Sequence, residues 1–154
     1  MRLLFVCTGN ICRSPTAEAV VRRMATDAGV AHDLVLESAG TGDWHVGEAP
    51  DPRAVKAAKK RGYDLRGIRA RQVRPADFEE FDVILAMTGG HMADLERMCP
   101  RGARAELRMM LAHAPKATHR DVPDPYYGDA RGFETMLDLI EESARGLLAD
   151  VARS

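Results

Sequence analysis

The chain has 154 residues, of which 45% are hydrophobic and 29% are charged, which is the balance of an ordinary soluble globular protein. Its formal net charge of -1 gives no indication of a nucleic acid partner or of attraction to an anionic membrane surface. No apolar run is long enough to span a membrane, and the apolar stretch at the start is too short for a signal peptide. We therefore expect one cytoplasmic domain over residues 1–154, without membrane insertion.

Strand and helix patterns alternate along the chain. Short apolar runs indicate strands, and apolar residues at intervals of three and four indicate helices. In chain order, the predicted elements are a strand at 2–6, a helix that begins at Ser14 and Pro15 and ends at Gly29, a strand at 33–38, a helix from about Pro52 to Arg61, a strand at 81–87, a helix at about 89–98, a weaker strand at 105–110 and a last helix with its apolar face between Phe133 and Val151. The glycine-rich residues 39–47 and the proline-containing residues 113–130 predict loops.

This alternation predicts an α/β fold, a parallel four-stranded sheet with helices on both faces. Ligands of such sheets bind outside the carboxyl ends of the strands. Residues 7–14 directly follow the first predicted strand and lead into the first helix. We therefore expect a phosphate-binding loop after the first strand.

Residues 7–14 combine an anion-binding loop with a nucleophile. Backbone N–H groups and the helix dipole attract an anion, and Gly9 and Asn10 are suited to the positive φ angles of a tight curl. The Arg13 guanidinium can bind two phosphate oxygens, and Cys7 lies in the same positive field, which favours a thiolate. A buried structural cysteine is the more common case, but this spacing makes it a poor explanation of Cys7. The predicted phosphate-binding residues are Thr8, Gly9, Asn10, Ile11, Cys12, Arg13 and Ser14.

The cysteine count excludes a disulfide framework. The three cysteines are an odd number, and a Cys-x4-Cys pair without two further ligands does not make a zinc site. We expect no metal site, and Cys7 and Cys12 are instead candidates for reactive thiols.

VCTGNICRSP, residues 6–15, resembles the signature of the low-molecular-weight protein tyrosine phosphatases. The likeness continues through SAGTGDWHVGEAPDPRAV (38–55) and ARQV (70–73) to DVPDPYYGD (121–129), and so covers nearly the whole chain. The resemblance implies hydrolysis of phosphotyrosine in a protein substrate through a phosphocysteine on Cys7. It implies Asp124 as general acid and base, although its PDP context alone would suggest a turn residue. No metal or cofactor is implied.

Further roles follow from the same resemblance. Arg13 would stabilise the equatorial phosphate oxygens, Asn10 would fix the loop backbone, and Ser14 would donate a hydrogen bond to the Cys7 sulfur beside its role as helix cap. The pocket mouth would be formed by Ile11, Trp44, Tyr126 and Tyr127. Relatives that act on phosphoarginine carry threonine in place of Ile11, so its apolar side chain favours phosphotyrosine. In relatives with a second cysteine like Cys12, that residue forms a reversible disulfide with the nucleophile.

The sequence departs from the family pattern at two places. Thr88 and His91 stand where relatives often have the Asp and Asn of MDxxN, and Ile68 replaces a histidine that supports the loop asparagine in relatives. The sequence pattern indicates no role for His91. The run from Arg53 to Arg74 holds nine Lys or Arg and one acid, Asp64; it is a solvated face by default, or a surface for acidic regions of a phosphoprotein partner.

Four alternatives remain open. A phosphoarginine phosphatase or an arsenate reductase could use the same fold, although the latter needs a later cysteine pair and only Cys99 is present. A cysteine phosphocarrier would have to preserve its phosphocysteine, against which Arg13 and the Asp124 loop argue. A phosphopeptide-binding module would not need Cys7. We expect a monomer.

Overall fold

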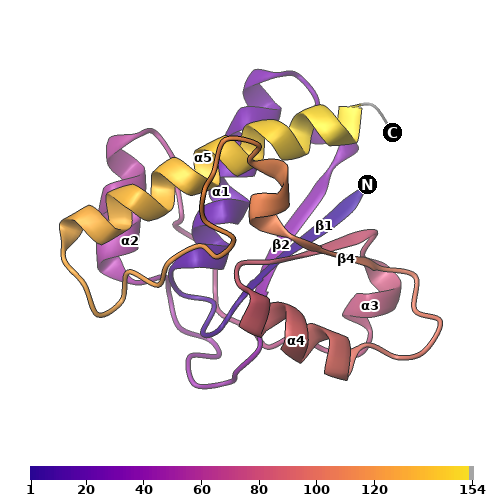
Figure 1. The fold of residues 1–154 in the computed structure, drawn as a ribbon. Coiled ribbons are helices and arrows are strands. Elements are labelled where there is room, and N and C mark those ends of the chain that lie inside the picture. Colours follow the sequence, from indigo (N-terminus) through magenta and orange to yellow (C-terminus); the bar gives the residue numbers. More distant parts are fainter. Residues whose placement is uncertain (153–154) are drawn as a thin grey trace.

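Four parallel strands form the centre of the molecule in the order β2-β1-β3-β4. The structure is a computed structural model and describes residues 1–152. The strands are β1 (Arg2–Cys7), β2 (Val35–Gly40), β3 (Val83–Ala86) and β4 (Glu106–Met109), and the helices are α1 (Arg13–Asp27), α2 (Pro52–Lys60), α3 (Asp77–Glu80), α4 (Gly89–Met98) and α5 (Ala130–Ala152), with 3₁₀ helices at Ala31–Asp33 and Met110–His113 (Figure 1). The predicted fold class is confirmed.

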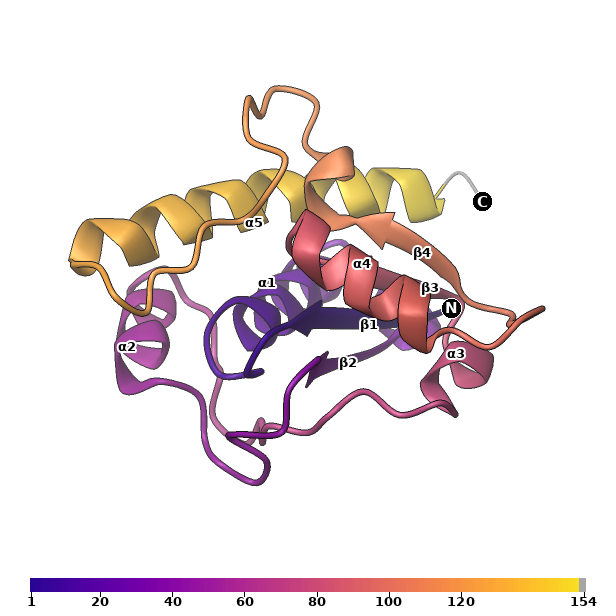
Figure 2. The ribbon, with the colours of Figure 1, turned by 60° about the horizontal axis from the view of Figure 1, so that its bottom comes forward.

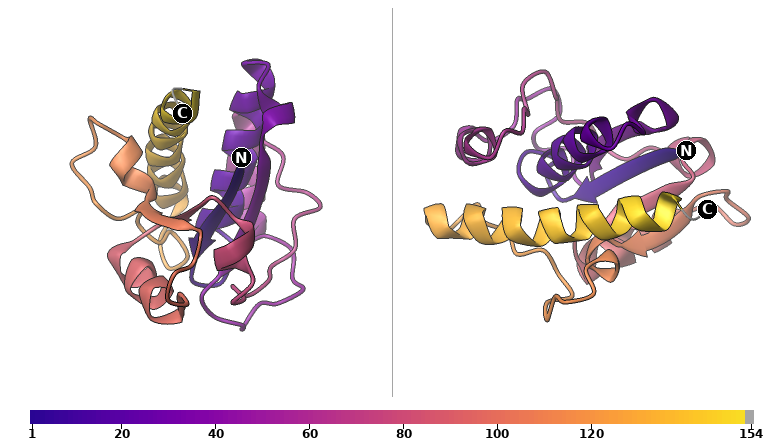
Figure 3. Two further views of the ribbon diagram at one scale, coloured as in Figure 1. Left: turned by 90° about the vertical axis from the view of Figure 1, so that its right-hand side faces the viewer. Right: turned by 90° about the horizontal axis from the view of Figure 1, so that it is seen from above.

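Both faces of the sheet are buried, and β1 supplies residues to each. Leu3 and Phe5 point to the cluster that contains α1, α2 and α5, whereas Leu4 and Val6 point to the cluster that contains α3 and α4. Figure 1 shows these two groups of helices on opposite sides of the strands, and Figures 2 and 3 show the long α5 running beside α1. Because β1 is covered on both faces and paired on both edges, its carboxyl end is a rigid place for a site.

Several predicted boundaries are wrong. β2 begins two residues later than predicted, because Ala31–Asp33 form a 3₁₀ helix and the register with β1 starts at Arg2 opposite Val35. The short helix α3 was not predicted, since four residues give no helical period. α1 begins at Arg13 with Cys12 as its cap residue, so Ser14 lies within the helix and is not the predicted cap. No helix of residues 1–152 is both long and apolar enough to cross a membrane.

Candidate active site

A loop of residues 8–12 joins the carboxyl end of β1 to the start of α1. Cys7, the last residue of β1, is 2% exposed, and its Sγ atom lies 3.0 Å from Ser14 Oγ. Within the described chain, the amides of residues 9–12 donate no hydrogen bond to another residue. Unpartnered N–H groups at the positive end of a helix form an anion site, and here it lies beside a buried cysteine.

The curl of the loop depends on Asn10, which has the predicted left-handed backbone with φ of 59°. The same prediction for Gly9 is wrong, because its φ is not in the left-handed region. Gly9 instead provides space: a Cβ atom there would lie 2.8 Å from Cδ2 of His45, so the imidazole would have to move. The loop at 39–47 therefore packs closely against the phosphate-binding loop.

The Asn10 side chain holds the loop from inside. It is 1% exposed, its Nδ2 donates to Ser14 Oγ over 2.7 Å, and its Oδ1 accepts from the Arg71 amide over 3.0 Å. Ser14 Oγ is thus occupied by Asn10 and Cys7, which explains why it caps no helix. The main chain of Arg71 therefore supports the Asn10 side chain.

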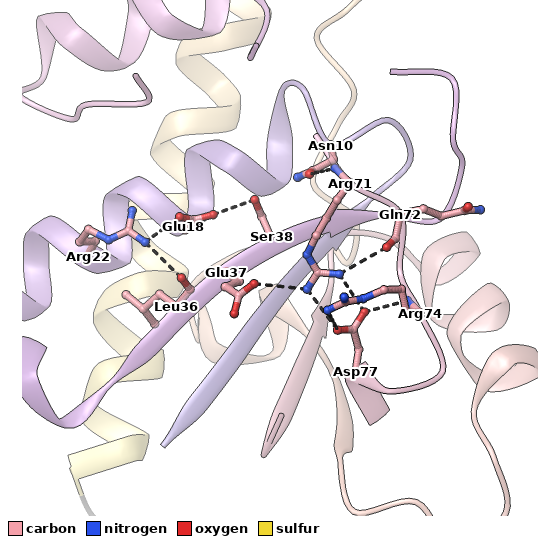
Figure 4. Close-up of polar contacts among 10 residues, drawn as sticks. All are labelled: Asn10, Glu18, Arg22, Leu36, Glu37, Ser38, Arg71, Gln72, Arg74 and Asp77. Carbon is pink, nitrogen blue, oxygen red and sulfur yellow. Dashed lines mark hydrogen bonds and ion pairs between the residues drawn. The ribbon is translucent and has the colours of Figure 1, made fainter. Parts of the chain in front are cut away.

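A buried ion pair fixes Arg71 in this position (Figure 4). The Arg71 guanidinium donates to both carboxylate oxygens of Asp77 at 3.0 and 3.1 Å, and the Asp77 side chain is fully buried. Burial alone would raise the pKa of Asp77, but its hydrogen bonds from Arg71 and Arg74 hold it below the usual value. The residue after Arg71, Gln72, also pairs with the end of β2 through a parallel β-bridge to Gly40. The Asn10 partner is therefore set by an element far away in the sequence.

Arg13 connects the loop to the segment that carries Asp124. Its Nη1 donates to the Val122 carbonyl over 3.1 Å, and its Nη2 lies 3.6 Å from Asp124 Oδ2. Val122 N in turn donates to the Met87 carbonyl, at the end of β3, over 2.8 Å. Arg13 is 6% exposed, whereas the Asp124 side chain is 43% exposed. A fixed cation therefore stands next to an accessible carboxylate.

One cavity of about 370 Å³ brings these groups together. Its lining residues are Cys7, Thr8, Gly9, Ile11, Cys12, Arg13, Trp44, His45, Asp124, Tyr126 and Tyr127. All four predicted mouth residues are among them, and Trp44 and Tyr127 are 70% and 91% exposed. The side chains of Asn10 and Ser14 are buried behind the loop. His45 was missed, because a histidine in a glycine-rich loop carries no signal of its own.

The rings at the rim give the cavity an aromatic entrance. Tyr126 and Tyr127 meet edge to face with ring centroids 4.9 Å apart. Within residues 1–152, no group of three His, Cys, Asp or Glu side chains could hold a metal ion. The chemistry that this site can support is attack by the Cys7 sulfur on an anion held by backbone amides and one guanidinium.

Comparison with known proteins decides the family. The family model described as low molecular weight phosphotyrosine protein phosphatase matches residues 2–154. The chain belongs to this family. A low molecular weight protein-tyrosine-phosphatase of Streptomyces coelicolor is 46% identical over 154 residues, covering 97% of this chain and 93% of that protein. The pig phosphatase of the family is 38% identical over 151 residues, covering 97% and 94%.

Solved structures agree with this assignment. A protein tyrosine phosphatase of Entamoeba histolytica superposes with a TM-score of 0.95 at 37% identity, covering 99% of this chain and 97% of that chain. A structure described as a Drosophila arginine phosphatase has a TM-score of 0.92 at 28% identity, covering 98% of each chain. The resemblance read from the sequence is confirmed.

His91, which the sequence left unexplained, supports the loop at a second point. Its Nε2 lies 2.7 Å from Thr8 Oγ1, its Nδ1 lies 3.1 Å from Thr88 Oγ1, and it is 5% exposed. Burial, assisted by the nearby Arg13, lowers the pKa of His91 to about 4. A neutral imidazole therefore bridges two threonine hydroxyls, and Thr8 Oγ1 in turn lies 3.5 Å from Arg13 Nη2. In this family member, the Thr88 and His91 departures form one connected pair.

Cys12 lines the same cavity as Cys7 and is 5% exposed. Burial, followed by the charges of Asp51 and Cys7, raises the pKa of the Cys12 thiol to about 12. The two cysteines in the loop therefore differ in setting. Cys7 Sγ forms a hydrogen bond with the Ser14 hydroxyl, whereas the raised pKa of Cys12 keeps its side chain a neutral thiol.

Proposed function

We propose that this protein hydrolyses phosphotyrosine in protein substrates through a phosphocysteine on Cys7. The observation that carries the proposal is the single cavity in which Cys7, Arg13 and Asp124 meet under an aromatic rim. A thiolate at the floor, a guanidinium at the side and a carboxylate at the mouth supply the three groups that in-line phosphoryl transfer requires.

In the first step, the Cys7 thiolate attacks phosphorus and the bond to the phenolic oxygen breaks. Arg13 and the unpartnered amides of residues 9–12 stabilise the equatorial oxygens of the transition state. Asp124, in its acid form, donates a proton to the departing oxygen, because phenolate is a poor leaving group. Its side chain lies 3.6 Å from the Arg13 guanidinium that holds the phosphate, where it can reach the bridging oxygen between phosphorus and the ring. The products are tyrosine and phosphocysteine.

In the second step, water attacks the same phosphorus and the sulfur leaves as a thiolate. The Asp124 carboxylate produced in the first step accepts the water proton. Ser14 Oγ, 3.0 Å from Sγ, donates a hydrogen bond to the leaving thiolate, and Asn10 keeps that hydroxyl in place. Inorganic phosphate is released and the enzyme returns to its starting state.

The rim favours an aromatic substrate. Ile11, Trp44, Tyr126 and Tyr127 offer apolar and aromatic surface on which a phenyl ring can stack, and a shorter phosphoserine would leave that surface unused. Phosphoarginine is the second candidate, because the Drosophila arginine phosphatase shares the fold over 98% of this chain. The apolar Ile11 argues for the aryl ring over a guanidinium.

The test is hydrolysis of phosphotyrosine, phosphoserine and phosphoarginine peptides in the presence of a chelator. Wild type should turn over phosphotyrosine; Cys7→Ser should abolish activity, and Asp124→Asn should slow it by about 10²- to 10⁴-fold. Asp121→Asn, a change on the same loop outside the cavity, serves as the matched control. Turnover of phosphoarginine alone would show that the substrate is phosphoarginine and not phosphotyrosine. A persistent phosphocysteine without turnover would indicate a phosphocarrier.

We also propose that the protein acts as a cytoplasmic monomer under redox control. One chain supplies all the cavity residues, and Cys7, Cys12 and Cys99 are free thiols, which suits a reducing compartment. Peroxide would oxidise the Cys7 thiolate to a sulfenic acid, and Cys12 would then form a disulfide with release of water. Light scattering tests the monomer. Recovery of activity by a thiol after peroxide, lost in Cys12→Ser, tests the disulfide.

A further inference from the structure

α2 packs against α5 (Figure 1). A second groove lies between α2 and the start of α5. Its volume is about 310 Å³. Arg53, Lys56 and Lys60 project from α2 into it, and Phe133 and the segment 128–130 lie on the opposite side. The mechanism above uses none of the lysines.

Arg53 lies between the groove and the catalytic cavity. The Arg53 guanidinium lies 5.2 Å from the ring centroid of Tyr126 and 5.1 Å from that of Phe133. Tyr126 lines the catalytic cavity, and Phe133 lines the groove. A polypeptide whose phosphotyrosine enters the cavity can therefore pass over Arg53 and place neighbouring residues in the groove.

The charges in the groove are unbalanced. Arg53 is paired with Asp51, but Lys56 and Lys60 are exposed and form no ion pair with any residue of 1–152. Their spacing of four places both ammonium groups on one side of α2. On the other wall, Asp129 is paired with Arg131, and Glu134 is paired with Arg61, which also pairs with Asp138 and Glu141. The groove lining therefore carries three cationic side chains against two carboxylates.

We propose that this groove binds acidic residues of the substrate polypeptide beside its phosphotyrosine. The proposal rests on the proposed function. Two unpaired ammonium groups match carboxylate side chains, and the partly exposed Ala57 offers apolar surface to the intervening chain. The catalytic cavity holds the phosphorylated residue, and the groove adds discrimination among the sequences around it. Two exposed ion pairs predict about a five-fold gain in kcat/KM at low salt.

The experiment compares pairs of phosphotyrosine peptides that differ only in having Asp and Glu or Asn and Gln near the phosphotyrosine. One pair carries these residues before the phosphotyrosine, and the other pair carries them after it. The measured quantity is the ratio of kcat/KM for the acidic peptide to that for the neutral one. Wild type should show a ratio of about five for at least one pair, and the ratio should fall in high salt.

The variants separate the groove from the overall charge of the helix. In Lys56→Ala/Lys60→Ala the ratio should fall to about one. Lys59→Ala removes one positive charge from the same helix, as each single variant Lys56→Ala or Lys60→Ala does. Lys59 lines a different hollow, beside Tyr63 and Asp64, so this control should keep the wild-type ratio. Charge reversal at Lys56 and Lys60 should invert the preference.

Three results would overturn the inference: a wild-type ratio of one for both peptide pairs, a ratio unchanged in the double variant, or an equal loss in Lys59→Ala. Failure of the proposed function is distinguishable, because wild type would then hydrolyse neither the acidic nor the neutral phosphotyrosine peptide. Failure of the inference alone leaves both peptides hydrolysed with equal kcat/KM.

Discussion

The neutral, buried His91 should make the stability of this protein unusually sensitive to mild acid. His91 contacts Thr8 and Thr88 and is almost inaccessible to water. The perturbation is a decrease in pH from 7 to 5, with His91→Asn as the comparison. Asparagine can donate and accept hydrogen bonds as the imidazole does, but it does not titrate.

The magnitude follows from the two pKa values of the imidazole. In the unfolded chain, His91 takes up a proton near pH 6.5, whereas in the native state its pKa is about 4. Between these values the unfolded state binds more protons, so stability present above pH 6.5 is lost as the pH falls. The loss amounts to about 2 kcal/mol at pH 5 and about 3 kcal/mol once the pH is below both values. Asp51 and Asp77, whose pKa values are lowered, stay ionised at pH 5.

The assay is urea denaturation of wild type and His91→Asn at half-unit steps between pH 7 and pH 5. The free energy of unfolding of wild type should fall by about 2 kcal/mol more than that of the variant. Loss of the contact with Thr8 should make the variant the less stable protein at pH 7, so the two curves converge in acid. Parallel curves, or an imidazole that titrates near 6.5 in NMR spectra of the folded protein, would refute the reasoning.

Three further predictions concern residues outside the catalytic cavity. Asp77→Asn should lower the free energy of unfolding in urea by about 2 to 3 kcal/mol and lower kcat, because it leaves Arg71 without its buried ion-pair partner. Unchanged values would show that this ion pair does not support Asn10 through Arg71. Ser14→Ala should slow breakdown of the phosphocysteine at least about tenfold, seen in rapid-quench experiments as accumulation of that intermediate; loss only in the first step would contradict this. Gly146→Ala should cost about 3 kcal/mol or more in thermal unfolding, because its Cβ would lie 1.7 Å from the His113 carbonyl oxygen, whereas Gly132→Ala on the same helix meets only ordinary contacts and should not destabilise.

The parts of the fold that follow from local patterns were predictable. The apolar runs located all four strands, and Asn10 took the left-handed backbone expected of it. Strand ends were less accurate, because β2 is aligned by its pairing with β1 and not by its own apolar residues. The helix α3 is a single turn, and its buried Asp77 looks like a surface residue in the sequence.

Ser14 shows why local rules fail near a site. In isolation, a serine before proline predicts a helix cap, and that interpretation was wrong. In the fold, its hydroxyl lies between Cys7 and Asn10, two groups that compete for it more strongly than backbone amides. The expectation that Ser14 donates a hydrogen bond to the Cys7 sulfur came only from the resemblance to the family; the structure places the two atoms 3.0 Å apart.

The supports of the phosphate-binding loop come from three distant segments, and none of them could be predicted from the loop itself. His91 contacts Thr8, the Arg71 amide donates to Asn10, and Arg13 donates to the Val122 carbonyl. In a parallel sheet, the connections that leave neighbouring strands meet at one edge, which is how the ends of β2 and β3 bring these segments to β1. A loop with unpartnered amides and a left-handed residue is unfavourable alone. Its shape is therefore a property of the whole sheet edge, which is why substitutions at Arg71 or His91 should impair catalysis without touching the substrate.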